Sequence, residues 1–155
     1  MATLHHILIP VKNQEQINKA RDFFVNILGF KVIRESATLG KFPKIEMTEA
    51  EKRLPDYYCH LMDENNSCID LVAFDEESPI KGIALGFQVD KIHETWDHLK
   101  DYPVKYIYDP ISYGEWALKS LGLKSGYFAF FGLKMGGIPH DGEEQLIELI
   151  ELNPE

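Results

Sequence analysis

The histidines are the residues of this chain best suited to chemistry, because imidazole binds divalent metals and exchanges protons near neutral pH. His5 and His6 are adjacent in a segment of alternating apolar residues, so a strand there would direct them to opposite faces. His60 and Asp70 lie in two segments typical of a hairpin with its turn at residues 64–66, and a suitable register would bring them side by side. Imidazole and carboxylate groups that converge from different strands are suited to hold a divalent ion on a sheet.

A glycine-rich segment near the carboxyl end carries a further imidazole. Residues 132–143 are expected to form a long loop, and His140 lies in its GGIPHDG stretch. This loop could fold over a binding site and bring His140 to it, or it could be an exposed connection. His93 and His98 fall on a predicted helix, where we expect them to face solvent.

Aromatic residues surround an irregular segment at residues 110–124. Tyr113 and Trp116 could line or cover an apolar pocket for an aromatic or acyl ligand, although most aromatic residues on the strands should belong to the core. Gln88 falls on a predicted strand, where alternation places it on the same face as Ala84. Small residues on that face would widen a pocket and admit a bulkier ligand.

Composition limits the classes of partner. The chain has 155 residues, 45% of them hydrophobic, which is enough for a packed core without disulfides. Its 25 acidic and 16 basic residues give a net charge of −9, so we expect no nucleic acid or anionic membrane as partner. Cys59 and Cys68 are expected to be reduced thiols, although their predicted strands could bring them close. The first residues lack a signal-peptide pattern and no apolar run approaches about 20 residues, so we expect a soluble, cytoplasmic protein.

The first half of the sequence predicts a strand, a helix and three further strands. Asn13 is suited to cap the helix and Gly29 to end it, and between them apolar residues recur at helical spacing. Residues 36–55 are polar and irregular, with room for one helical turn. The predicted strands cover residues 4–11, 30–34, 57–62 and 68–74, and the helix covers residues 14–28.

The second half repeats this order after about 75–80 residues. Its helix, residues 91–99, should direct Ile92, Trp96 and Leu99 inward, and residues 115–121 could form a short additional helix. Neither half alone has enough core for comfortable stability, so we expect residues 1–155 to form a single domain made of two repeats. The predicted strands cover residues 83–89, 104–108, 127–131 and 146–152.

Four stretches carry a resemblance to a known superfamily. They are HILIPV at 6–11, FFVNILGF at 23–30, IALGFQVD at 83–90 and LIELIE at 146–151. In this order and spacing they resemble the vicinal oxygen chelate superfamily of glyoxalases, extradiol dioxygenases and bleomycin-resistance proteins, over nearly the whole chain. The resemblance implies an α+β, glyoxalase-like fold. Two βαβββ modules, about 1–75 and 82–152, would form a curled mixed sheet around an open cavity.

The resemblance also implies where metal ligands would lie. In this superfamily they come from the cavity face of the first and fourth strands of each module, which correspond here to His6, Asp70, Ala84 and Glu148. Ala84 departs from the pattern, because its side chain cannot coordinate a metal. One imidazole and two carboxylates are left, which is a chemically adequate set with open positions for a substrate.

The missing ligand leaves two functions open. If His6, Asp70 and Glu148 hold one divalent ion (zinc, manganese, iron, magnesium or nickel), the resemblance implies a lyase, isomerase or dioxygenase that acts on a small oxygenated molecule, with Glu148 moving protons. His60 or His140 could then replace the lost imidazole. Without a metal, the cavity would bind and sequester an aromatic or drug-like molecule, as bleomycin-resistance relatives do. A homodimer is compatible with either function but is not required.

Overall fold

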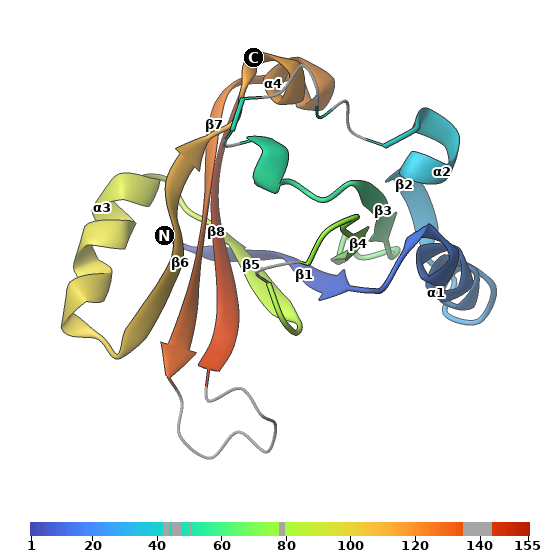
Figure 1. Cartoon of the computed structure of the whole chain (residues 1–155), viewed down its shortest axis with the longest axis horizontal. Helices are drawn as coiled ribbons and strands as arrows, with labels where there is room; N and C mark the ends of the chain where they lie inside the picture. The colour runs from blue at the N-terminus through green and yellow to red at the C-terminus, as the bar shows by residue number, and fades with distance from the viewer. Residues whose placement is uncertain (42–43, 45–47, 50, 78–79, 135–143) are drawn as a thin grey trace. The chain divides into compact units, whose positions relative to one another are not determined.

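The chain forms two compact units, whose elements are shown in Figure 1. The first-half unit is His5–Ile83, and the second-half unit is Ala84–Glu155 together with Met1–Leu4. The computed structural model describes residues 1–41, 44, 48–49, 51–77, 80–134 and 144–155. His140 and the rest of residues 135–143, for which a long loop was predicted, lie outside the described residues.

The first-half unit has the predicted order of a strand, a helix and three strands. Its elements are β1 (Thr3–Pro10, which belongs to this unit from His5 onward), α1 (Gln14–Asn26), β2 (Lys31–Glu35), α2 (Ser36–Leu39), η2 (Glu51–Arg53), β3 (Tyr57–Met62) and β4 (Cys68–Ala73). The strand order is β2-β3-β4-β1. β3 runs antiparallel to β2 and β4, and β1 runs parallel to β4. This mixture of parallel and antiparallel pairs agrees with the predicted fold class.

Local chemistry fixes both ends of α1. The Asn13 side chain accepts a hydrogen bond from the Gln16 backbone nitrogen at 3.0 Å, which satisfies a donor that the helix leaves unpaired. At the other end Gly29 has φ +74°, a backbone conformation that suits glycine. The Phe30 nitrogen then donates to the Phe24 carbonyl at 3.0 Å and closes the last turn. Both boundary residues agree with the sequence prediction.

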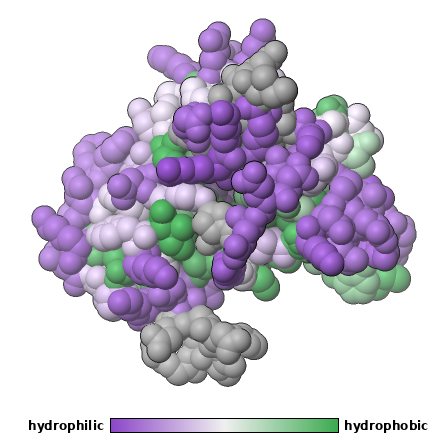
Figure 2. All heavy atoms as spheres, viewed as in Figure 1, coloured by the Kyte–Doolittle hydropathy of each residue, from purple (hydrophilic) through white to green (hydrophobic). Residues whose placement is uncertain are grey.

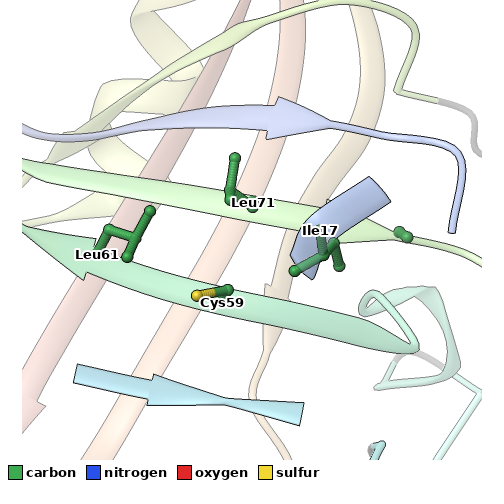
Figure 3. Packing of buried hydrophobic residues seen from close by; sticks show 5 residues of the cluster. Ile17, Cys59, Leu61 and Leu71 are labelled. Atoms are coloured by element: carbon green, nitrogen blue, oxygen red, sulfur yellow. The ribbon is translucent and has the colours of Figure 1, made fainter. Parts of the chain in front are cut away.

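One face of the first-half sheet packs against α1. Ile17 of the helix and the strand residues beneath it are at most 1% exposed (Figure 3). Successive side chains on a strand point to opposite faces, so the residues between these buried positions face away from α1. The fully buried cluster consists of Ile17, Cys59, Leu61, Leu71 and Ala73.

Part of the apolar pattern of α1 is not buried. Phe23, Ile27 and Leu28 remain 52%, 68% and 53% exposed. Ile17, Ala20 and Phe24 pack in the sheet cluster and recur at the three- and four-residue spacing of one helix face, and Val25 contacts the same cluster. Phe23 and Ile27 lie to one side of that face.

The second-half unit repeats the order of the first. Its elements are β5 (Ala84–Gln88), α3 (Ile92–His98), η3 (Leu99–Asp101), β6 (Val104–Ser112), α4 (Glu115–Leu121), β7 (Leu123–Lys134) and β8 (Glu144–Pro154). The strand order is β5-β8-β7-β6, with β5 parallel to β8 and the other pairs antiparallel. α3 lies along this sheet (Figure 1), and the predicted inward residues Ile92, Trp96 and Leu99 all pack in its core.

Three strands of the second-half unit are longer than the sequence predicts. β6 continues through Pro110 to Ser112, and its register against β7 shifts between Tyr108 and Ile111. Proline lacks the amide hydrogen that a ladder requires and is tolerated at such an irregularity in an edge strand. β7 and β8 pair from Leu123 opposite Pro154 to Lys134 opposite Glu144, well beyond their apolar centres. Continuous pairing with a neighbouring strand therefore extends each strand past its hydrophobic pattern.

Figure 2 shows hydrophilic side chains over most of the viewed face. None of the helices in the described ranges is both long and apolar enough to cross a membrane.

Replacement of Ile17 by alanine should lower the free energy of unfolding by about 2–5 kcal/mol, because it leaves a cavity in the buried cluster. Ile27→Ala removes the same atoms from a side chain that is 68% exposed, so it should change stability by less than about 0.5 kcal/mol. Urea unfolding followed by far-ultraviolet circular dichroism measures both changes. Equal losses would contradict the packing of Ile17 against the sheet.

The two cysteines lie on paired strands but not opposite each other. The register pairs Cys59 with Leu71 and Cys68 with Met62, and both thiols are free. Burial raises the pKa of the Cys59 thiol to about 12, and the charge of the Glu35 carboxylate adds to this rise. Burial also raises the pKa of Cys68, which is only partly buried. Cys59 should therefore be the less reactive thiol.

With a thiol-specific disulfide reagent at pH 8, the Cys59→Ser variant should keep a thiol that reacts in the native protein. The Cys68→Ser variant should react only in denaturant, since its remaining thiol is buried and protonated. Absorbance of the released reagent measures both rates. Fast reaction of native Cys68→Ser would show that β3 opens readily or that Cys59 is accessible.

Candidate functional site

A row of polar side chains crosses the face of the first-half sheet that points away from α1, here called the distal face. His60 and Asp70 are direct partners in the β3–β4 register, and each lies between core residues on its own strand. Arg34 is the partner of His60 across the β2–β3 pair. His6 lies on β1, one alternation away from Leu8, which is the partner of Asp70. Neighbouring strands thus contribute side chains in the order Arg34, His60, Asp70 and His6.

Asp70 lies close to both imidazoles of this row. Its Oδ2 atom is 3.8 Å from His6 Nε2 and 4.0 Å from His60 Nε2. The His6 side chain is 5% exposed, Asp70 21% and His60 29%. The adjacent His5 is exposed, but its Nδ1 atom lies 3.0 Å from His6 Nδ1. The register that sequence reasoning left open for His60 is therefore the one that brings it beside Asp70.

The pKa of His60 lies below the ordinary histidine value, which favours the neutral imidazole. Burial lowers the pKa of its imidazole, and the charge of Arg34 and the nearby His6 and His5 lower it further. The Asp70 carboxylate acts in the opposite direction but does not compensate. A neutral imidazole presents a nitrogen lone pair, which can accept a proton or bind a metal ion.

Arg34 is the site residue that sequence reasoning missed. Its guanidinium carbon lies 5.3 Å from the centre of the Tyr58 ring, within the range of a cation–π contact. The Tyr58 ring is buried, and its centre is 5.4 Å from that of His60. Tyr58, His60 and Arg34 thus form one contiguous group on the distal face.

A β-bulge directs Arg34 to this face. Val32 pairs with Leu61 and Arg34 pairs with His60, so Ile33 is an extra residue in β2. Without the bulge, alternation would place Ile33 opposite His60 and turn Arg34 toward α1. The strand sequence KVIRE contains no feature that marks this irregularity.

The bulge also turns Glu35 toward α1. Glu35 pairs with the core residue Cys59, and its Oε2 accepts a hydrogen bond from Arg21 Nη1 of α1 at 2.8 Å. The side chains of this ion pair are 21% and 12% exposed for Arg21 and Glu35. An ion pair on the helix side therefore stabilises the backbone arrangement that places Arg34 on the distal face.

In the second-half unit, Glu148 lies on the sheet face away from α3. It is 7% exposed, and its register partners are Gly86 on β5 and Phe130 on β7. Ala84 is fully buried and lies two residues before Gly86, on the same face, and Gln88 lies two residues after it. A carboxylate buried among apolar neighbours is unfavourable unless it has polar partners. Buried carboxylates of this kind are typical of functional positions.

Tyr113 packs against other residues of the second-half unit. Its ring centre is 5.1 Å from that of Phe128, and its backbone nitrogen donates to the Gly126 carbonyl at 3.0 Å. A Cβ atom at position 126 would lie only 2.8 Å from Tyr113 Cδ2, so the absence of a side chain at Gly126 makes room for the ring. Trp116 is partly buried on α4. A role for Tyr113, Trp116 or Gln88 in ligand binding stays a prediction.

The metal site expected from the sequence is not preformed in the described part of the chain. Among those residues, no three His, Cys, Asp or Glu side chains are grouped closely enough to hold an ion. Ligand atoms around one zinc ion lie about 3.4 Å apart, so the His6–Asp70 and His60–Asp70 distances exceed that spacing by a few tenths of an ångström. Glu148 belongs to the other unit, and its inclusion in a set with His6 and Asp70 stays a prediction.

Comparison with known proteins identifies the family. Residues 3–131 match the Glyoxalase/Bleomycin resistance protein/Dioxygenase superfamily. Since this match spans most of the chain, the protein belongs to that superfamily, and the resemblance found in the sequence is confirmed. No curated protein matches the chain.

Solved structures agree with this fold. A hypothetical protein from Bacillus halodurans C-125 is 21% identical with a TM-score of 0.61, and the match covers 99% of this chain and 96% of that one. A superfamily member from Vibrio splendidus 12B01 is 15% identical with a TM-score of 0.53, covering 97% and 99%. An Mn(II)-bound glyoxalase from Novosphingobium aromaticivorans is 12% identical with a TM-score of 0.50, covering 100% of this chain and 42% of that protein. At these identities the likeness concerns the fold.

The lowered pKa of His60 predicts a pH-dependent stability. As the pH drops below the ordinary histidine value of 6.5, His60 binds a proton in the unfolded chain before it does so in the folded chain. The free energy of unfolding should therefore decrease as the pH is lowered. His60→Gln should reduce this fall, and His98→Gln, at an exposed position on α3, should leave it unchanged. Urea unfolding between pH 7 and 5 in a chelating buffer measures the slopes. Identical slopes for the wild type and His60→Gln would contradict the burial of a neutral imidazole.

Proposed function

We propose that this protein is an enzyme that uses a divalent metal ion to bind and transform a small oxygenated molecule. His6, Asp70 and His60 would hold the ion on the distal face, and Glu148 is a further candidate ligand from the second-half unit. The observation that carries this proposal is the position of the Asp70 carboxylate, within 4.0 Å of both imidazoles.

The donor set supports the proposal. Two imidazoles and one carboxylate from adjacent strands form a combination that binds divalent transition metals and leaves positions open for a substrate. His60 would replace the imidazole of the superfamily pattern that this chain lacks at Ala84. The side chains would have to draw together by a few tenths of an ångström, which small side-chain rotations can supply.

The candidate residues would have different roles in the reaction. A bound divalent ion would supply Lewis acidity toward the oxygen atoms of a substrate. Asp70 and His6 would fix the position of the site, since their strands lie side by side in the first-half sheet. Glu148, buried on its own sheet, would transfer a proton in lyase or isomerase chemistry. Dioxygenase chemistry would use the same donor set with iron.

A metal-free binding protein of the bleomycin-resistance type is the alternative. It is favoured by the spacing of the donor atoms, which is wider than an occupied metal site requires. In that case His60, Arg34 and Tyr58 would contact an organic ligand directly. Measured affinity for metal ions separates the two functions.

Calorimetric titration of chelator-treated protein with Mn²⁺, Fe²⁺ under argon, or Zn²⁺ should show one bound ion per chain. His6→Ala and Asp70→Asn should abolish binding, and His60→Ala should weaken it, because each removes a ligand. His98→Ala removes an exposed imidazole on α3 and serves as the matched control. An absence of binding in the wild type would support the metal-free alternative. Binding that survives in Asp70→Asn would show instead that the ion is held by other residues and would overturn this ligand set.

Glu148→Gln belongs to the same series. A loss of metal affinity would assign Glu148 as a ligand, whereas turnover lost at unchanged affinity would assign it as the proton-transfer group. The cytoplasmic location, the homodimer and the assembly of both units into one functional domain stay predictions.

A further inference from the structure

We propose that Arg34 recognises a carboxylate, so that the small molecule bound on the distal face is a carboxylic acid. This inference rests on the proposed function for the location of the ligand, but it does not require a metal ion. It adds a specificity-determining residue and a substrate class to the site.

The bulge in β2 is the first argument. Regular pairing would have turned Arg34 toward the apolar side of the sheet and placed Ile33 opposite His60. Instead the extra residue Ile33 is 56% exposed, and Arg34 joins the polar row. Bulges are frequent beside active sites, where they redirect a side chain. Because of this bulge, an arginine and not an isoleucine lies opposite His60.

The support of Arg34 is the second argument. Its guanidinium lies 5.3 Å from the ring centre of the buried Tyr58, which restricts the planar group to one region of the distal face. Tyr58 is in turn held by Ser36, whose hydroxyl accepts a hydrogen bond from the Tyr58 nitrogen at 3.0 Å and donates to its carbonyl at 3.1 Å. A positioned guanidinium offers paired N–H donors that match the two oxygens of a carboxylate.

The charges around the row favour a single negative charge on the ligand. Asp70 is the row's own carboxylate and lies on the far side of His60 from Arg34. Strands β2 and β4 are two positions apart, which separates their backbones by about 10 Å. A monocarboxylate beside Arg34 therefore gains an ion pair without direct contact with Asp70, whereas a doubly charged phosphate would be repelled more strongly. The ring of Tyr58 adds an aromatic surface next to the carboxylate position.

The test uses the full chain after removal of metal with a chelator and dialysis. Benzoate, the isosteric neutral benzamide and inorganic phosphate are titrated separately, and ligand-observed NMR gives the affinities. Benzoate should bind at least about tenfold more tightly than benzamide, because only the carboxylate carries a negative charge and two acceptor oxygens for a bidentate ion pair with a guanidinium. Phosphate should bind more weakly than benzoate.

Variants locate the effect. Arg34→Gln should weaken benzoate binding by at least about tenfold and remove the preference over benzamide, and Arg34→Lys should restore part of it because it keeps the charge without the fork. Arg53→Gln changes the net charge equally at an exposed position on η2 and should leave benzoate affinity unchanged. Thermal unfolding verifies that each variant is folded.

The outcomes are separable from those of the metal experiment. Equal benzoate affinity in wild type and Arg34→Gln, equal affinity for benzamide, or tighter binding of phosphate would overturn the carboxylate assignment. None of these results depends on whether the chain binds a metal. Conversely, Arg34→Gln should retain the metal affinity of the wild type, and a failed metal titration would leave the benzoate comparison intact.

Discussion

The register between β3 and β4 is the constraint on which the candidate site depends. Burial of Cys59 and Leu71 beneath Ile17 fixes which residues of these strands face α1. A shift of either strand by one residue would expose its buried set to the distal face. His60 and Asp70 lie between the buried positions and are therefore held away from the helix. The packing that stabilises the unit also positions the imidazole and the carboxylate.

β2 follows a different rule, because it is an edge strand with an extra residue. The ion pair between Arg21 and Glu35 satisfies a charged group on the helix side of the sheet and stabilises the bulge at Ile33. As a result Arg34 lies on the distal face, where it forms the β2 end of the polar row. Two neighbouring charged residues thus serve opposite faces, one for the attachment of α1 and the other for the candidate site.

The second-half unit obeys the same alternation with different contents. Leu149 and Ile147 pack toward α3, and Glu148 between them is buried on the other face. The small residues Ala84 and Gly86 lie on that face of β5. The two units therefore share an order of elements but differ in their polar groups. The first-half unit carries two imidazoles, a guanidinium and the Asp70 carboxylate, and the second-half unit carries the buried carboxylate of Glu148.

The sequence by itself determined the repeated order of strands and helices and the ends of α1, because these follow from local periodicity and from residues such as Asn13 and Gly29. The fold class came from the resemblance to the superfamily. The superfamily pattern also predicted His6 and Asp70 as candidate site residues. Only the tertiary structure decided that His60 is the partner of Asp70 and that Arg34 joins them. Strand register and bulges depend on hydrogen bonds and burial between segments that are distant in the chain. Period-two alternation within one segment therefore does not specify the register or predict a bulge.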